Sequence, residues 1–352
     1  MSETFDVVVV GGGQAGLAAG YVLNDTDLQY TILDESPGIG HAWRSRWASL
    51  RLFTVARYSA LPGLEFPGDP EHSPTTDEVA DYLEAYARHF SLPVRLGTRV
   101  EELTDDDGGF VLETSGGTYK AQQVIVATGA YQRPHVPSIS QRLDSGVVQL
   151  HAAEYRNPDQ LPDDGEVLVV GAGNSGVEIA EELSESRRVY LSVGSKLGWL
   201  PRRILGKSVH WWGERLGMIR APVNGWYGRR VAASEGLIGT SVRQLKRRHG
   251  VQLRGRVVAG DGRRVVFADG SSLEVPVVVW ATGYASDYRW IRLPVLDEEG
   301  DPIHRRGVTD VPGLYFLGLK FQHSAGSALI GWVEEDARFI VDALQARARH
   351  LA

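Results

Sequence analysis

Two apolar runs, at residues 7–10 and 167–170, are each followed by Gly-x-Gly-x-x-Gly and then by a stretch with helical spacing. A continuous run of valine and leucine is typical of a parallel strand that is buried on both faces. The repeated pattern therefore predicts two strand–turn–helix units in one chain. Two later apolar runs, 124–131 and 277–284, each carry Ala-Thr-Gly near their ends. We expect one of them to close each unit.

The remaining pattern predicts strands at 30–36 and 187–196, and a strand, a glycine-rich turn and a helix over 312–344, with the helix running from 333 to about 348. These elements predict an α/β fold with two Rossmann-like dinucleotide-binding domains, the second inserted in the first. We expect the first domain at 1–160 and 285–352, and the second at 161–284 with a helical insertion at about 200–248. The chain would cross between them near 157–164 and near 285–287.

The amino-acid composition of the chain excludes several kinds of functional site. The chain has 352 residues, a formal net charge of −7 and no cysteine. Negative charge argues against a nucleic-acid partner. Without cysteine there is no disulfide, thiolate metal site or thiol nucleophile, so redox chemistry requires a bound cofactor. No His/Asp/Glu spacing suggests a metal site, no apolar run is long enough for an integral membrane segment, and no secretory leader is evident, so we expect a cytoplasmic protein.

The first glycine loop has the features of a dinucleotide site. Gly11 permits the tight turn, Gly13 leaves room for a pyrophosphate, and Gly16 lets the helix pack on the strand. The phosphates would lie at the helix N-terminus, which favours an anion. Asp34 and Glu35 end the next strand about 20 residues later, where an acid accepts ribose hydroxyls. The pattern predicts a dinucleotide with an unsubstituted ribose.

The second loop, with Gly171, Gly173 and Gly176, differs where the acid would stand. Ser192, Gly194 and Lys196 occupy the end of its next strand. Lys196, Arg202 and Arg203 could pair with a 2′-phosphate, although an ordinary solvated surface is an equally good interpretation of these charges. The second site therefore favours NADPH, with NADH as the alternative.

Several longer stretches resemble one family. These stretches are similar to the short bacterial flavin-containing monooxygenases, class B flavoproteins with two dinucleotide-binding domains: residues 40–90, which begin "GHAWRSRWASLRLFTVARYSALPG", the linker "HAAEYRNPDQLP" (151–162), "LPRRILGKSVHWW" (200–212) and "GLYFLGLKFQHSAGSALIG" (313–331). The likeness covers nearly the whole chain.

The resemblance implies roles for particular residues. FAD would be held by Gly11, Gly13, Gln14, Ala15, Gly16, Asp34, Glu35, Ala42, Trp43, Thr54, Val100, Ala127, Thr128, Gly129, Gln322 and Leu329. The nicotinamide nucleotide would be held by Gly171, Gly173, Asn174, Ser175 and Gly176. Apart from the resemblance, Arg51 could contact a phosphate or the nicotinamide ribose, and a surface salt bridge is an equally good interpretation. Phe53, Thr54, Gln322 and His323 are the candidate catalytic residues, with Phe53 and Thr54 facing the isoalloxazine.

The sequence departs from the family pattern in three places. Ser145 and Val147 occupy the Phe and Gly positions of the fingerprint that His151 and Tyr155 otherwise fit. Phe53 stands where many members that oxygenate nitrogen and sulfur have Asn. Gly194 stands where an Arg often contacts the 2′-phosphate, so the preference between NADPH and NADH stays open.

The implied activity is an NAD(P)H- and O2-dependent monooxygenase that acts through a 4a-hydroperoxyflavin on a small organic substrate, at nitrogen or sulfur or beside a ketone. The alternative is an NAD(P)H–flavin oxidoreductase that passes electrons to a protein or quinone, and a third interpretation is a flavin-bound redox sensor. Members of the family that the sequence resembles often form dimers, so the resemblance also allows a homodimer. For the basic, Trp-rich stretch 202–248 three interpretations stand: a substrate-access lid, a membrane-surface helix or an inserted helical cap.

Overall fold

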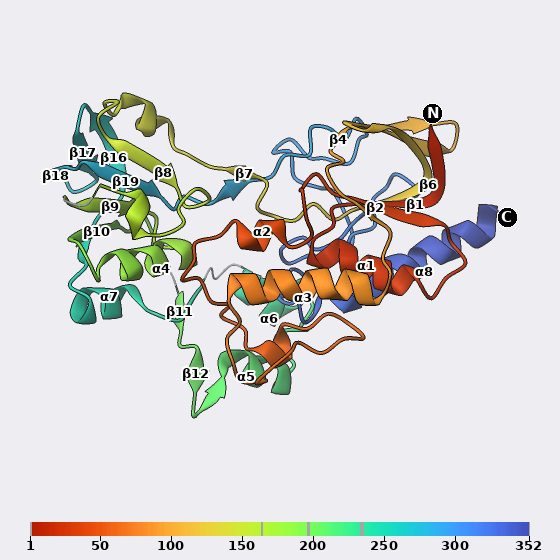
Figure 1. Ribbon diagram of the computed structural model, residues 1–352, viewed down its shortest axis with the longest axis horizontal. Helices are drawn as coiled ribbons and strands as arrows, with labels where there is room; N and C mark the ends of the chain where they lie inside the picture. Colours follow the sequence, from red (N-terminus) through yellow and green to blue (C-terminus); the bar gives the residue numbers. More distant parts are fainter. Residues whose placement is uncertain (1, 163–164, 196–197, 233–235, 352) are drawn as a thin grey trace.

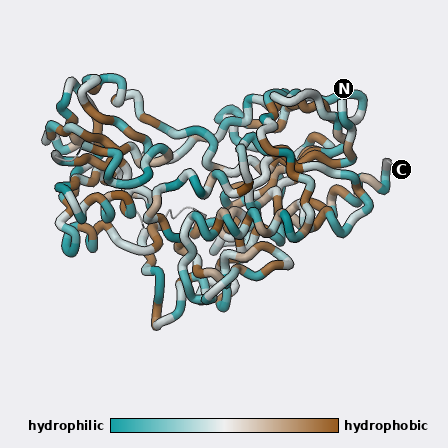
Figure 2. The backbone as a smooth tube through the Cα atoms, viewed as in Figure 1, coloured by the Kyte–Doolittle hydropathy of each residue, from teal (hydrophilic) through white to brown (hydrophobic). Residues whose placement is uncertain are grey.

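The computed structural model describes residues 2–162, 165–195, 198–232 and 236–351, and shows two lobes, each built on its own sheet (Figure 1). The stretches of chain coloured as hydrophobic run along the strands at the centre of each lobe (Figure 2). Among the helices of this described part, none combines the length and the apolar character that crossing a bilayer requires.

The first sheet contains the first glycine unit. Its order is β3 (Val94–Arg95), β2 (Tyr30–Leu33), β1 (Glu3–Val10), β6 (Gly117–Val126), β5 (Gly109–Thr114) and β4 (Val100–Asp106), and β21 (Leu314–Phe316) also pairs with β6. β1 runs parallel to β2 and β6. Val7 and Val9 belong to one core cluster and Val8 and Val10 to another, so β1 is buried on both faces, as its continuous apolar run predicts.

Three helices cover one face of this sheet: α1 (Gln14–Leu23), α3 (Thr76–His89) and α8 (Val333–Leu351) (Figure 1). α8 spans the C-terminal helix that the sequence predicts. Two shorter helices follow β2 along the chain, α2 (His41–Arg44) and the 3-10 turn η1 (Ala56–Tyr58). Within residues 41–58 the chain reaches the core of the second lobe at Trp47 and returns to the core of the first lobe at Leu52 and Ala56.

The second sheet is parallel throughout. Its order is β15 (Gln252–Arg254), β10 (Val189–Ser192), β9 (Val167–Val170), β19 (Val277–Trp280) and β8 (Val148–His151). α4 (Asn174–Leu183) follows β9, and α7 (Val242–Arg248) packs beside it. The antiparallel strands β16 (Val257–Asp261), β17 (Arg264–Phe267) and β18 (Ser272–Glu274) complete this lobe, with the 3-10 turns η2 (Ser138–Arg142) and η3 (Pro158–Gln160). The first sheet is mixed, since β4, β5 and β6 pair in antiparallel fashion, but the strands around each glycine unit are parallel in both sheets, which confirms the predicted α/β fold.

The chain passes between the lobes on two short paired strands. β7 (Arg133–Pro134) leads out of the first lobe and β20 (Tyr284–Ala285) leads back, and the two pair in antiparallel fashion. β8 already belongs to the second sheet, so the chain joins that lobe before the polar stretch 157–164 where the crossing was expected. An edge strand of four residues carries too weak a pattern to be recognised from the sequence.

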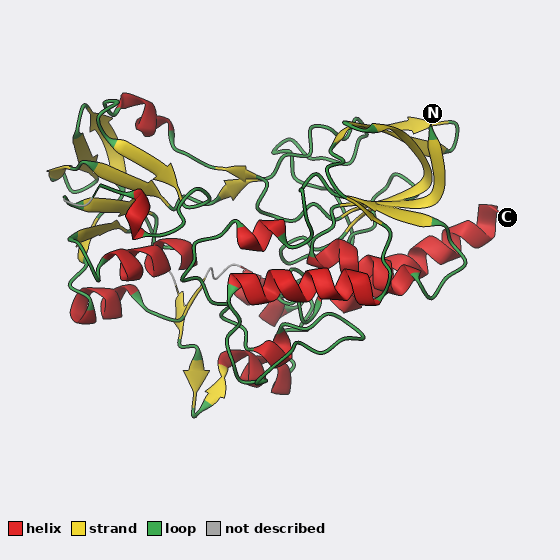
Figure 3. Cartoon of the chain, in the orientation of Figure 1, coloured by secondary structure: helices red, strands yellow, loops and turns green. Residues whose placement is uncertain are grey.

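The insertion between β10 and β15 holds strands as well as the expected helices (Figure 3). β11 (Gly198–Leu200) pairs with β14 (Gly236–Ile238), and β12 (Arg203–Ile204) forms a hairpin with β13 (Lys207–Ser208). α5 (Val209–Arg215) and α6 (Trp226–Ala232) follow. Strands of two or three residues fall below the length at which alternation can be read from a sequence.

Candidate functional site: two glycine loops and the segment between them

The first glycine loop leaves room only where a ligand needs it. Gly11 has φ +110°, and a Cβ there would run into the carbonyl oxygen of Ala127. A Cβ at Gly16 would overlap the carbonyl of Gly11, whereas a Cβ at Gly13 would meet no atom within 4 Å. Gly13 is also exposed at the start of α1. The loop therefore presents open space at the N-terminus of a helix, which fits a pyrophosphate.

Asp34 follows β2 and lies directly against this loop. One carboxylate oxygen accepts from the Gly12 amide at 2.5 Å and the other accepts from the Ser36 amide at 2.8 Å. The acid is therefore held in place beside the nucleotide space and keeps lone pairs for further donors. Glu35 is exposed and pairs with Arg99 at 3.6 Å, farther from the loop.

The Ala-Thr-Gly segment at the end of β6 closes the same site. The Ala127 amide donates to the carbonyl of Val10 at 2.8 Å, which brings residues 127–129 next to the glycine loop. Gln132 donates to the Thr128 hydroxyl at 3.0 Å and to the Gly129 carbonyl at 2.9 Å. Val100, at the start of β4, is buried in the core cluster that includes Val10.

The C-terminal segment folds back over this loop. Gln14 donates to the carbonyl of Ala328 at 2.8 Å, and Ala15 faces Gly318 so closely that no Cβ would fit there. Leu329 is half-buried in this segment. Gln322 is buried, and its amide accepts from the Leu319 amide at 3.2 Å and donates to the Arg306 carbonyl at 3.4 Å. The Gln322 side chain thus stabilises this loop, and a catalytic role for Gln322 stays a prediction.

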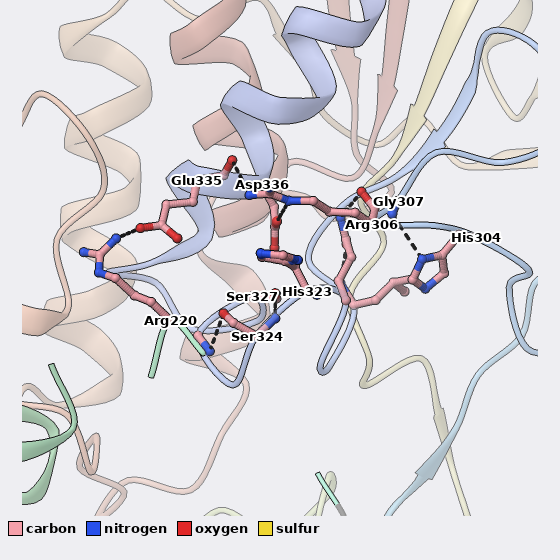
Figure 4. Close-up of polar contacts among 12 residues, drawn as sticks. Arg220, His304, Arg306, Gly307, His323, Ser324, Ser327, Glu335 and Asp336 are labelled. Carbon is pink, nitrogen blue, oxygen red and sulfur yellow. Dashed lines mark hydrogen bonds and ion pairs between the residues drawn. The ribbon is translucent and has the colours of Figure 1, made fainter. Parts of the chain in front are cut away.

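His323 lies beside a buried ion pair at the start of α8 (Figure 4). Arg306 donates to Asp336 at 3.0 Å, and the Asp336 side chain is only 3% exposed. The main chain of His323 is fixed by its amide, which donates to the Ser327 hydroxyl at 3.0 Å. Burial and the Arg306 guanidinium lower the pKa of the His323 imidazole, and Asp336 opposes them. A neutral imidazole is therefore the resting form at this position.

Residues 42–54 carry the aromatic candidates. Ala42 is exposed on α2, and Trp43 is half-buried against the core of the first lobe. Phe53 stacks on His210 of α5, with ring centroids 5.5 Å apart and an interplanar angle of 17°. The buried Thr54 hydroxyl shares a hydrogen bond with Ser59 at 2.8 Å.

Arg51 lies in the same segment and has an exposed side chain for which no ion pair or hydrogen bond occurs within the described ranges. The guanidinium is thus available to an anion.

The second glycine loop repeats the first. Gly171 has φ +108°, and a Cβ there would run into the Ala281 carbonyl. A Cβ at Gly176 would overlap the Gly171 carbonyl, whereas a Cβ at Gly173 would meet no atom within 4 Å. Asn174 begins α4 and its side chain accepts from the Ile238 amide at 3.0 Å, so β14 lies over the start of that helix. Ser175 is half-buried on its first turn.

The basic residues of the expected 2′-phosphate site have other partners. Arg202 donates to Glu178 of α4 at 3.0 Å and to the Leu52 carbonyl at 3.3 Å. Burial raises the pKa of Glu178 to about 7, although Arg202 opposes this shift. Arg203 pairs with Glu71 at 3.2 Å. Lys196 lies outside the described residues.

Two residues that the sequence analysis did not select lie at these sites. Arg256, just after β15, donates to the carbonyl of Gly194 at 3.0 Å, so a guanidinium occupies the neighbourhood of the position where the family often has Arg. His210 is 5% exposed, and its Nδ1 has no hydrogen-bond partner within the described chain. Burial lowers the pKa of His210 to about 4. No local signal marks Arg256, because its contact spans 62 residues.

Residues 46–52 connect the two lobes. Trp47 is buried in the core cluster of the second lobe, and the Ala48 amide donates to the Arg156 carbonyl at 2.8 Å. Arg46 donates to the Tyr284 hydroxyl on β20 at 2.6 Å. The segment that follows the first glycine unit along the chain therefore packs against the second lobe. In the part of the chain that is described, no group of three or more His, Asp or Glu side chains is placed to hold a metal ion.

A family model described as pyridine nucleotide-disulphide oxidoreductase matches residues 8–197. The chain is 46% identical over 344 residues to a Geobacillus kaustophilus (strain HTA426) protein described as "Uncharacterized oxidoreductase CzcO-like", covering 97% of this chain and 99% of that one. It is 28% identical over 356 residues to the indole-3-pyruvate monooxygenase YUCCA1 of Oryza sativa subsp. japonica, covering 89% of this chain and 86% of that one.

Solved structures share the fold. The flavin-containing monooxygenase from Stenotrophomonas maltophilia has a TM-score of 0.83 and 27% identity, covering 98% of this chain and 99% of that one. A bacillithiol disulfide reductase from Bacillus cereus has a TM-score of 0.73 and 20% identity, covering 98% and 100%, and this likeness concerns the fold alone. The present chain has no cysteine that could take part in thiol–disulfide exchange.

Proposed function

The chain belongs to the pyridine nucleotide-disulphide oxidoreductase family, and from this premise we propose that it is an FAD- and NADPH-dependent monooxygenase. It would transfer one atom of O2 to a small organic substrate at a nitrogen or sulfur atom, with a ketone as the alternative acceptor. One observation carries the proposal: residues 46–52 connect two lobes, each of which carries a glycine loop of the same construction. Such an arrangement suits hydride transfer from one nucleotide to the other.

The residues of the first lobe fit FAD. Gly13 and the N-terminal amides of α1 would hold the pyrophosphate, and Asp34 the ribose. The exposed α2, with Ala42 and Trp43, and the segment at 328–329 would bracket the flavin. Bound FAD accepts a hydride from the nicotinamide and, once reduced, activates O2. The fit rests on space at Gly13 and on an acid fixed by two backbone amides.

The chain itself would keep the site dry. Phe53 stacks on His210, Tyr58 stacks on Trp332 with centroids 5.5 Å apart, and His210 lies 6.1 Å from the Trp332 ring. Trp332 in turn donates to Glu214 of α5 at 2.6 Å. These rings join α5 to the segment at 53–58 and would exclude water there, which the activation of O2 by a reduced flavin for oxygen transfer requires.

Coenzyme preference would depend on Arg256. Its guanidinium lies at the carbonyl of Gly194, at the carboxyl end of β10, where a 2′-phosphate would stand. We expect Arg256→Gln to raise the KM for NADPH roughly tenfold or more and to leave the KM for NADH unchanged, since a charge-assisted hydrogen bond would be lost. Arg263→Gln, which removes an exposed Arg on the same lobe, is the matched control. Equal changes for both coenzymes would contradict the assignment.

The test of the whole proposal uses the FAD-loaded protein, NADPH and ¹⁸O2 with a panel of amines, sulfides and ketones. We expect NADPH oxidation that depends on substrate and a product that carries one ¹⁸O atom. NADPH oxidation that is supported by quinones or carrier proteins, with no labelled product from any panel member, would instead establish the reductase alternative. A protein that neither binds nor can be reconstituted with FAD would overturn both.

A further inference from the structure

The hairpin of β12 and β13 projects from the body of the molecule and ends in an exposed apolar residue (Figure 1). Leu205 at its turn is 87% exposed. Leu205 has φ +49° and Gly206 has φ +76°, so both turn residues adopt the left-handed conformation. That turn strongly favours Asn, Asp or Gly, and leucine is strained there. The fold needs neither the strain nor the exposed side chain, so the tip calls for another explanation.

The tip is fixed to α5, which begins directly after it. Ser208 caps that helix by accepting from the Trp211 amide at 3.1 Å, and the Trp212 indole donates to the Ile204 carbonyl at 2.9 Å. Ile204, next to Leu205, is 36% exposed, and Leu216 at the end of α5 is 64% exposed. Apolar side chains are thus displayed at both ends of one anchored unit, which we define as residues 203–216 and call the tip unit.

Positive charge accompanies these apolar residues. The tip unit contains three Lys and Arg and one carboxylate, in a chain whose net charge is −7, and three further arginines follow it at Arg220, Arg229 and Arg230. The carboxylate, Glu214, already accepts from Arg220 at 2.9 Å and from the Trp332 indole. Lys207 lies 5.8 Å from the ring of Trp211. Neither Lys207 nor Arg215 forms an ion pair with any described carboxylate. The tip unit is therefore a cationic region on an anionic protein.

We propose that the tip unit docks the protein on an anionic lipid bilayer. Exposed Leu and Ile side chains would enter the apolar boundary, Lys207 and Arg215 would pair with lipid phosphates, and Trp211 and Trp212 are residues that favour the interface. A second copy of the chain fits less well, because a two-fold contact through this unit would set cations against cations. Nucleic acid offers phosphates but gives no reason to display Leu205.

The experiment is cosedimentation of the FAD-loaded full chain with vesicles of phosphatidylcholine alone or mixed with phosphatidylglycerol. We expect binding to the anionic vesicles only, weakened by salt. Leu205→Asn should raise the lipid concentration for half-maximal binding about tenfold, because an inserted side chain is lost. Asn suits the left-handed turn, so this variant keeps the fold. Ile303→Asn, at an apolar residue that is 47% exposed in the other lobe, is the matched control and should bind as the parent does.

A double variant, Lys207→Gln with Arg215→Gln, should weaken binding to anionic vesicles in the same assay and reduce its dependence on salt. Equal binding to both kinds of vesicle, no binding to either, or an unchanged Leu205→Asn variant would overturn the proposal. So would a concentration-dependent dimer, seen by sedimentation velocity without lipid, that Leu205→Asn abolishes, because a second copy would then be the occupant.

Discussion

At the scale of single residues, the glycines of each loop perform two different tasks. Gly11 and Gly171 need a positive φ and lie against a carbonyl, so they shape the backbone. Gly13 and Gly173 have ordinary extended backbones at the start of α1 and α4, and a side chain there would project into open space. Substitution should therefore disrupt folding at the first pair but only ligand binding at the second pair.

The variants Gly13→Val and Gly173→Val test this division and serve as controls for each other. The free energy of unfolding of both variants should stay within about 1 kcal/mol of the parent, since a Cβ at either position meets no atom within 4 Å. Gly13→Val should be purified without FAD. Gly173→Val should retain FAD but show a KM for NADPH raised at least about tenfold, because the side chain would block a pyrophosphate. Absorbance of the purified proteins and steady-state kinetics measure both outcomes. Full FAD content in Gly13→Val would contradict the assignment of the loops.

The buried His210 makes stability depend on pH. Its pKa is about 4 in the folded chain, below the ordinary value of 6.5, because burial disfavours the charged ring. The unfolded state therefore binds more protons between these values, and stability falls as pH decreases from about 6.5 toward 4. The parent should lose up to about 3 kcal/mol of its free energy of unfolding over this pH range through His210, and the His210→Phe variant should not show this loss. Urea unfolding at several pH values measures the difference. An identical pH slope in both proteins would contradict it.

At the scale of elements, α3 shows how a local signal supports the site. Thr75 accepts from the Glu78 amide at 3.2 Å, and Glu78 accepts from the Thr75 amide at 2.7 Å, which forms a capping box. The Thr75 amide and His72 lower the pKa of Glu78 to about 2. Farther along, the Tyr82 hydroxyl accepts from the Leu61 amide at 2.7 Å. α3 thus holds the chain that continues from residues 53–58.

Removal of the Thr75 cap tests how much it stabilises α3. Thr75→Ala should lower the free energy of unfolding by about 1 kcal/mol, since one amide at the helix start loses its acceptor. Thr75→Ser retains the hydroxyl and should stay within about 0.5 kcal/mol of the parent. Urea denaturation at neutral pH compares the three proteins. Equal losses in the two variants would mean that packing of the Thr75 methyl group, and not the cap, is responsible.

At the scale of the whole molecule, the relative position of the two lobes depends on a few contacts beside the paired crossing strands. Arg46 bonds the Tyr284 hydroxyl, and its guanidinium lies 4.8 Å from the Tyr131 ring centre. The His151 ring donates to the Gly283 carbonyl at 3.0 Å while accepting from the Ala153 amide. These polar contacts join the burial of Trp47 in fixing the junction between the lobes.

Tyr284→Phe removes the bond from Arg46 and keeps the ring contacts. We expect unchanged FAD content and melting temperature, and a rate of anaerobic flavin reduction by NADPH that falls roughly threefold to tenfold, because hydride transfer is sensitive to small misplacements. Tyr131→Phe is the control, since that hydroxyl has no hydrogen-bond partner among the residues described. Stopped-flow absorbance measures the reduction. Equal rates for all three proteins would show that the Arg46 bond does not position the lobes.

The sequence by itself determined the α/β class, the two glycine units and the burial of their strands. These features follow from local rules: a continuous apolar run must be buried on both faces, and a tight turn against a carbonyl accepts only glycine. The long helix α8 was predicted for the same reason, since its apolar spacing repeats over many residues.

Only the tertiary structure decided which charges and rings meet. Arg256 reaches Gly194, Arg202 pairs with Glu178, and His210 stacks on Phe53, although each pair is far apart along the chain. β8 joins the second sheet for a similar reason, because its pairing with β19 depends on chain more than a hundred residues later. Ion pairs and aromatic stacking act over short distances, and their two partners have no fixed spacing along the sequence. Which residues pair is therefore decided only when the lobes fold.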